Sequence, residues 1–299
     1  MNSLSSIKNF ALHGWIGIFL IVIFWFINWS LQGLRTHWGF FPLWLGYCLT
    51  IDAIVFKKRG TSLLTRSPQK YIGLFLISAP SWWLFELFNS HLKNWQYLGK
   101  ENFTPVEYAL FETISFSTVI PAVFGSAELA STFNWIKKIK IPVSLKDNSL
   151  TLLIFFALGI LLLISIIKWP VIFYPFVWIT VYFLIEPFNI KAGFSSIINF
   201  TLKGNWQPVI SLAVGCLICA FFWEMWNFYS YPKWIYHLPY VNAPKLFEMP
   251  LPGYIGYIPF SFELFALTSL VYGLMKLKLS DYMKKSNVYP IPWTDFALI

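Results

Sequence analysis

The chain has 299 residues, of which 57% are hydrophobic, 21% are aromatic and only 12% are charged, and its mean hydropathy is +0.61. This composition excludes a disordered chain, an ordinary soluble enzyme and a disulfide scaffold, because so few polar groups could not cover a water-facing surface. The formal charge of +9 could indicate a nucleic acid partner. The positions of the cations indicate a membrane surface instead, so we expect no nucleic acid.

Eight apolar stretches are long enough to cross a bilayer, which takes about 20 helical residues. They lie at residues 14–31, 38–56, 71–90, 105–128, 150–167, 169–186, 208–230 and 252–274. Pro170 separates the fifth stretch from the sixth and predicts a tight hairpin there, because proline ends a helix. The sequence therefore predicts an all-α integral membrane protein with about eight transmembrane helices.

The basic residues predict the orientation of these spans. With eight spans the two termini share a side, and the segments on that side carry 16 of the 22 Lys and Arg residues. The positive-inside rule then places both termini in the cytoplasm. We expect the protein in the cell (inner) membrane.

A weak internal repeat divides the chain into two halves, residues 1–140 and 141–299. The segment Trp83–Asn89, followed by Trp95-Gln96-Tyr97, parallels Phe221–Asn227, followed by Trp234-Ile235-Tyr236. Each half would contribute four helices, and an even number gives both copies the same orientation. We expect one integrated membrane domain of two pseudo-symmetric four-helix halves, with equivalent residues at equal depth.

Four glutamates lie well inside the predicted spans, where an ionised carboxylate is costly, rather than at the ends of these spans. They are Glu86, Glu112, Glu224 and Glu263. No span that holds one of them contains a Lys or Arg, so we expect neutral acids or acids that share a proton. Asp52, Glu128 and Glu186, near the cytoplasmic helix ends, are expected to be solvated.

The neighbours of Glu86 and Glu224 suggest supporting roles. Asn89 and Asn227 each follow an acid by three residues and share its helix face, which would let them orient it. Aromatic rings flank both acids and could stabilise a cation through their faces: Trp82, Trp83, Trp223 and Trp226. Glu107 follows Thr104-Pro105, which fits either a helix cap or a catalytic residue.

No nucleotide, metal or cofactor motif occurs in the sequence. The four His residues have no metal-ligand spacing, and Cys216 and Cys219 lie inside one apolar span without a second pair. We expect neither a metal nor a soluble cofactor.

The first half is similar to the membrane-embedded lycopene cyclases of the heterodimeric bacterial and fused fungal type. The similarity rests on Trp83–Glu86, Asn94–Tyr97 and Pro105–Tyr108, which resemble that family's acid beside an aromatic, its Trp-x-Tyr motif and its Pro-x-Glu-Glu or Pro-x-Glu-Asp motif. The pair Trp223-Glu224 also resembles the membrane-bound meroterpenoid cyclases, whose intramembrane acids are thought to start cyclisation by protonation. The chain departs from these families at Tyr108, which replaces the second acid, and in its number of spans.

The resemblance implies an isoprenoid or carotenoid-type cyclase (an isomerase or lyase) that protonates an alkene or epoxide in a lipid-soluble substrate. Glu86 or Glu224 would donate the proton, Glu112 would relay or accept it, and Glu263 would line the substrate site. A proton- or cation-coupled transporter with an intramembrane acidic site is the alternative. A non-catalytic scaffold, in which apolar residues could replace the acids, is a third possibility.

Overall fold

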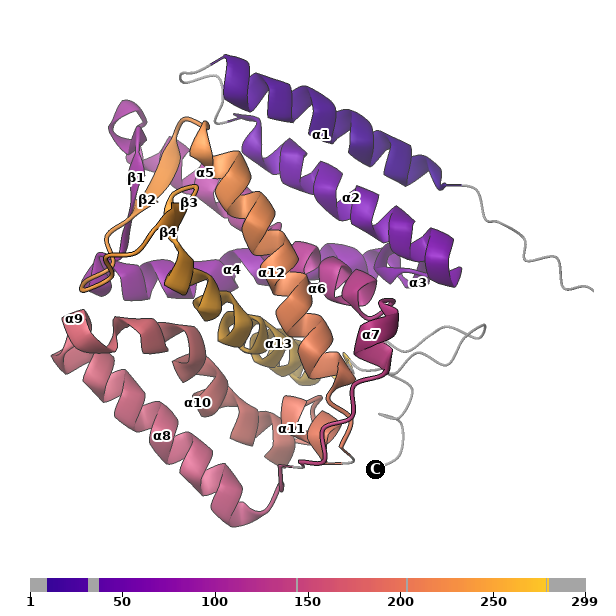
Figure 1. The fold of residues 1–299 in the computed structure, drawn as a ribbon, viewed down its shortest axis with the longest axis vertical. Helices are drawn as coiled ribbons and strands as arrows, with labels where there is room; N and C mark the ends of the chain where they lie inside the picture. The colour runs from indigo at the N-terminus through magenta and orange to yellow at the C-terminus, as the bar shows by residue number, and fades with distance from the viewer. Residues whose placement is uncertain (1–9, 32–37, 144, 203, 278, 280–299) are drawn as a thin grey trace, which may run out of the picture.

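The computed structural model describes residues 10–31, 38–143, 145–202, 204–277 and 279, and they form a mostly helical bundle (Figure 1). Within this part of the chain, eight helical segments are long and apolar enough to cross a membrane, which confirms the predicted integral membrane protein. The first three are α1 (Leu12–Ser30), α2 (Phe40–Arg59) and α4 (Pro68–Leu92). The fifth and seventh are α8 (Ser149–Lys168) and α12 (Gln207–Phe228).

The other three spans are interrupted helices. The fourth consists of α5 (Pro105–Phe116) and α6 (Val119–Ala130), the sixth of α9 (Pro170–Phe173), η3 (Tyr174–Phe176) and α10 (Val177–Lys191), and the eighth of η4 (Leu251–Gly256) and α13 (Tyr257–Leu274). Pro170 opens α9 directly after α8 ends at Lys168, as its ring geometry predicts. At the fourth span's break, the Ser78 hydroxyl donates to the Phe116 carbonyl and accepts from the Ile120 amide at 3.0 Å. One side chain thus satisfies two backbone groups that the interruption leaves open.

Short elements cover the two ends of the bundle (Figure 1). At one end lie the strands β1 (Trp95–Leu98), β2 (Lys233–Tyr236), β3 (Lys245–Leu246) and β4 (Met249–Pro250), with η2 (Lys100–Asn102) after β1. At the other end lie the short helices α3 (Leu63–Arg66), α7 (Asn134–Lys137) and α11 (Ile197–Thr201).

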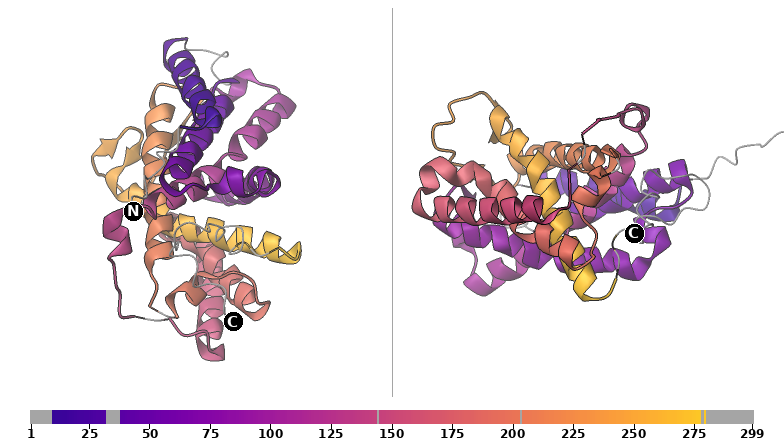
Figure 2. Two further views of the ribbon diagram at one scale, coloured as in Figure 1. Left: turned by 90° about the vertical axis from the view of Figure 1, so that its right-hand side faces the viewer. Right: turned by 90° about the horizontal axis from the view of Figure 1, so that it is seen from below.

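The long helices pack in a connected series. α1 packs on α2, α2 and α4 pack on α6, α8 packs on α10, and α10 and α12 pack on α13. The helices α1 and α8 lie at opposite ends of the long axis, and α6 packs against α12 between them (Figure 2). At Gly215 on α12 an added Cβ would lie 2.3 Å from the Ala127 backbone nitrogen, so this crossing requires a glycine.

The expectation that Asp52, Glu128 and Glu186 are solvated is wrong. Their exposed fractions are 2%, 1% and 0%. Asp52 accepts from the Leu64 amide at 2.9 Å and Glu186 accepts from the Ile198 amide at 2.9 Å, so these acids cap α3 and α11. Glu128 pairs with Arg66 at 2.6 Å. The chain folds back over the helix ends, and the backbone amides of the short helices and a guanidinium replace water.

Candidate functional site

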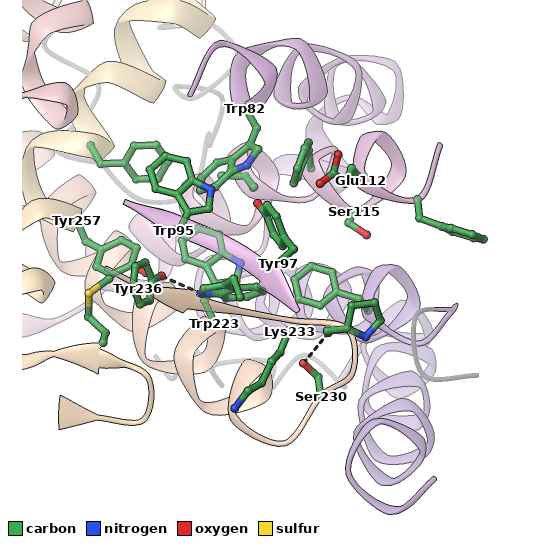
Figure 3. A pocket seen from close by; sticks show the side chains of 18 of the residues that line it. Trp82, Trp95, Tyr97, Glu112, Ser115, Trp223, Ser230, Lys233, Tyr236 and Tyr257 are labelled. Carbon is green, nitrogen blue, oxygen red and sulfur yellow. Dashed lines mark hydrogen bonds between the residues drawn. The ribbon is translucent and has the colours of Figure 1, made fainter. Parts of the chain in front are cut away.

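A cavity of about 170 Å³ lies beside the β1–β2 ribbon (Figure 3). Its wall combines residues of both halves of the sequence, because α4, β1 and α5 contribute to it together with α12, β2 and α13. Most of the wall is aromatic. The rings include Trp82, Trp95, Tyr97, Tyr108, Phe116, Trp178, Trp223, Trp234, Tyr236, Tyr257 and Phe260.

The ribbon presents four aromatic side chains on one face. β1 and β2 pair antiparallel, with Trp95 opposite Tyr236 and Tyr97 opposite Trp234. Side chains alternate between the faces of a strand, so two Trp-x-Tyr segments in this register place all four rings on the same side. All four line the cavity.

Glu86 lies behind these rings rather than in the cavity wall. Its Oε1 atom accepts three hydrogen bonds, from Trp82 Nε1 at 3.0 Å, from Trp95 Nε1 at 3.0 Å and from the Tyr97 hydroxyl at 2.6 Å. An indole nitrogen can only donate, so this carboxyl oxygen acts purely as an acceptor. All three donors line the cavity, so Glu86 is connected to the cavity through their hydrogen bonds.

Glu224 occupies a similar place on the other side. The hydroxyls of Tyr236 and Tyr257 both donate to its Oε1 atom at 2.7 Å. Both phenols line the cavity, whereas Glu224 is fully buried and does not. Both carboxyl groups thus lie behind the wall of one cavity, each bonded to residues that line it.

Asn89 and Asn227 bind backbone instead of orienting the acids directly. The Asn89 amide donates to the Trp95 carbonyl at 2.8 Å and accepts from the Trp95 amide at 3.2 Å. Asn227 makes the same pair of bonds to Trp234, at 2.7 and 2.9 Å. Each asparagine therefore fixes the start of a strand, and it positions the strand's Trp and Tyr rather than the carboxyl group.

The two ribbon phenols stay protonated over a wide pH range. Burial raises the pKa of Tyr97 well above its ordinary value, and the adjacent carboxylate of Glu86 adds to the shift. Burial and the Glu224 carboxylate raise the pKa of Tyr236 in the same way. Both hydroxyls can therefore donate to their carboxyl groups at physiological pH.

Glu112 differs from the other acids because it lines the cavity directly. In Figure 3, Glu112 and Ser115 lie at one end of the cavity and Tyr257 lies at the other. Glu112 also lies close enough to Tyr97 to interact with it electrostatically, as Glu86 does. The carboxyl groups of Glu86 and Glu112 therefore both act on the Tyr97 phenol.

The four tryptophans predicted to flank the acids differ in their position relative to the cavity. Trp82 and Trp223 line the cavity, and Trp223 stacks on Tyr257 with ring centroids 6.1 Å apart. Trp83 lies outside it, is 36% exposed and donates to Thr113 Oγ1 at 3.0 Å. Trp226 is buried against Trp44, with centroids 5.1 Å apart, and does not line the cavity.

Glu107 and Glu263 have backbone partners away from the cavity. Glu107 forms a capping box at the start of α5, where its Oε2 atom accepts from the Thr104 amide at 3.0 Å. Glu263 is fully buried, and its Oε1 atom accepts from the Val181 amide at 2.8 Å. Neither residue is part of the cavity wall.

Several wall residues were not predicted from the sequence. The Trp-x-Tyr repeat was recognised as a repeat, and strand alternation around it could have identified Tyr97 and Tyr236 as site residues. Trp178 and Tyr257 carry no local signal. They reach the cavity from the sixth and eighth spans only through tertiary packing.

The described residues contain no group of three or more His, Cys, Asp and Glu side chains that could hold a metal ion. Comparison with known protein families, characterised proteins and solved structures finds no match to this chain. The site therefore has to be interpreted from its own geometry.

Proposed function

We propose that the protein is an integral-membrane cyclase for an isoprenoid or carotenoid-like lipid and that it starts ring formation by protonating an alkene or epoxide. One observation carries the proposal: a single aromatic cavity has one carboxyl group in its wall, Glu112, and two more directly behind it, Glu86 and Glu224. Aromatic faces beside acids suit a carbocation, because the rings stabilise positive charge without forming a bond to it.

Glu112 is the proton donor in this proposal. A donor must reach the substrate, and Glu112 is the only one of the three acids in the wall. Its proton adds to one alkene carbon, the π electrons form the new C–H bond, and the neighbouring carbon becomes cationic. A second alkene of the same molecule attacks this carbon and closes the ring.

Proton return completes the reaction without a net change in atoms. The ring cation loses a proton from an adjacent carbon to the Glu112 carboxylate, which restores the donor, and those C–H electrons form the product alkene. Glu86 accepts three hydrogen bonds at its Oε1 atom and contributes electrostatically from behind the wall. The phenols and indoles bonded to Glu86 and Glu224 hold these two carboxyl groups behind the wall that faces the ring cation.

The proposal includes the pseudo-symmetric halves, residues 1–140 and 141–299, with both termini in the cytoplasm. Matched contacts at both ends of the bundle support the two halves. Asn89 and Asn227 make the same bonds to their strands, and Asp52 and Glu186 each cap an amide twelve residues ahead. The chain ends lie outside the described residues, and the orientation rests on the distribution of Lys and Arg.

The alternative function, a proton- or cation-coupled carrier, needs a site that opens to both sides. The cavity lies at the β1–β2 end, whereas acids at the other end are paired, Glu128 with Arg66 at 2.6 Å and Asp52 with His13 at 3.1 Å. This arrangement favours an enzyme.

The proposal is tested by lipid profiling of isoprenoid-producing host cells with and without the protein. We expect a new product of unchanged mass, or a cyclised alcohol from an epoxide. Glu112→Gln should lower its formation about 100- to 10,000-fold, the usual range for a general acid. Glu107→Gln, which alters only the cap of the same helix, is the matched control and should retain product formation. Unchanged profiles, or full activity of Glu112→Gln, would refute the cyclase.

A further inference from the structure

Asn28 is an uncommon residue in the first span. Only three residues of α1 are buried, namely Gly14, Gly17 and Asn28. The two glycines allow close packing, because a Cβ on Gly14 would lie 2.4 Å from Ala53 Cβ and one on Gly17 would lie 2.7 Å from the Gly46 carbonyl oxygen. Close approach of the helices thus explains both glycines but does not explain Asn28.

The Asn28 side chain is 1% exposed, and neither its amide oxygen nor its amide nitrogen has a hydrogen-bond partner among the described residues. Burying an unpaired amide is unfavourable. The buried amides of Asn89 and Asn227 contrast with it, because each bonds to a strand.

Asn28 contributes to the wall of the cavity, together with Glu112, Ser115 and Ser230. A pure hydrocarbon in the cavity would leave the Asn28 amide unpaired. A ligand oxygen would accept from its NH₂ group, and a ligand hydroxyl could also donate to its carbonyl oxygen.

We propose that Asn28 hydrogen-bonds an oxygen-bearing group of the lipid substrate, a hydroxyl, carbonyl or ether, so that the cavity selects an oxygenated isoprenoid over a pure hydrocarbon. This inference rests on the proposed function of the site and narrows its substrate class. Asn28 is then a specificity-determining residue that acts from a helix contributing none of the acids.

The test measures binding of two probes to the full chain in phosphatidylcholine nanodiscs. The probes are farnesol and the corresponding triene hydrocarbon that lacks only the hydroxyl. Phospholipid is present in every measurement, so its ester carbonyls compete for the same site. Farnesol that stays bound therefore binds in preference to the lipids of the bilayer. We expect wild-type protein to bind farnesol about tenfold more tightly than the hydrocarbon, the effect of one good hydrogen bond.

Asn28→Leu should reduce this preference to about twofold or less and raise the Tm of the ligand-free protein, because it removes an unpaired amide. Ser211→Ala is the matched control. The Ser211 hydroxyl is also buried without a partner, but Ser211 does not line the cavity. This variant should raise the Tm while the tenfold preference remains.

Equal binding of the two probes by wild-type protein, binding of neither, or a preference that survives in Asn28→Leu would overturn the inference. If such a result came together with loss of product formation in Glu112→Gln, the proposed cyclase would stand. Only the inference that Asn28 binds an oxygen of the substrate would be refuted. Conversely, an Asn28-dependent preference for farnesol in a protein without cyclase activity would refute the proposed reaction. It would still support a binding site for an oxygenated isoprenoid.

Discussion

The surroundings of Glu86 and of Glu224, here called the first and the second corner, share one arrangement of asparagine, strand and tyrosine. They differ in the remaining hydrogen-bond donors. In each, an asparagine three residues after the acid fixes a strand, and the strand's tyrosine donates to the acid, at 2.6 Å from Tyr97 and 2.7 Å from Tyr236. The remaining donors differ, since Glu86 receives two indole N–H groups and Glu224 receives the Tyr257 phenol. The bonds that both corners share, from the asparagine to the strand and from the strand's tyrosine to the acid, are called the frame below. The remaining donors distinguish the two carboxyl groups chemically.

The two corners also differ in their nearest charges. On the first side Glu112 lies in the cavity wall and interacts with Tyr97. On the second side Lys233 of β2 forms an ion pair with Glu248. The first corner therefore has two carboxyl groups around one phenol, and we expect it to carry more of the proton transfer than the second.

The largest difference expected between the two corners comes from replacing the acid of each in turn. Glu86→Gln should lower turnover about 100-fold, the lower end of the range for acid–base groups, and Glu224→Gln only about tenfold. The larger loss follows from the place of Glu86 beside Tyr97 and Glu112. Product formation per folded protein measures the ratio, with folding checked by the thermal transition in detergent. Equal losses would show that the corners contribute equally, and a reversed order would contradict the division of labour.

A smaller effect on stability tests whether the frame is the same in both corners. Asn89→Ala and Asn227→Ala each remove two hydrogen bonds to a strand, and each should lower the free energy of unfolding by about 2–3 kcal/mol. Denaturation in mixed micelles measures both values. Losses that differ by more than about 1.5 kcal/mol would break the structural equivalence of the corners, whatever their catalytic roles.

The smallest effect concerns alkaline pH. Because the pKa of Tyr97 and that of Tyr236 are raised by burial, their contribution to stability is fully present below pH about 10, the ordinary tyrosine pKa, and is lost as the pH rises above it. Wild-type Tm should therefore fall from pH about 10 upward. Tyr97→Phe and Tyr236→Phe should each cost about 1 kcal/mol at neutral pH and flatten the alkaline fall. A fall of unchanged steepness in both variants would assign it to other groups.

The membrane architecture could be predicted from the sequence because it depends on span length and composition alone. The boundaries of α8 and α12 differ from the predicted spans by two residues or fewer. The desolvation cost of a carboxyl group in an apolar run likewise identified Glu86, Glu112 and Glu224 as unusual residues. These are local properties that a single segment reveals.

Relations between segments could not be predicted. The burial of Asp52 and Glu186 depends on α3 and α11 folding back, and short helices leave little trace in an apolar sequence. The position of Glu112 in the wall, with Glu86 behind Trp95, depends on which helix face meets the ribbon. Asn28 reads as one polar residue in a lipid-facing helix until the packing of α1 is known.

The β1–β2 ribbon has a consequence for biosynthesis. Its strands lie 138 residues apart between their first members, Trp95 and Lys233, so β1 leaves the ribosome long before its partner exists. Neither strand can pair alone. The β1–β2 ribbon beside the cavity therefore forms only after the seventh span, α12, has been synthesised. Assembly of the cavity wall is therefore one of the last steps in folding, and a truncated chain ending before β2 would lack half of the ribbon.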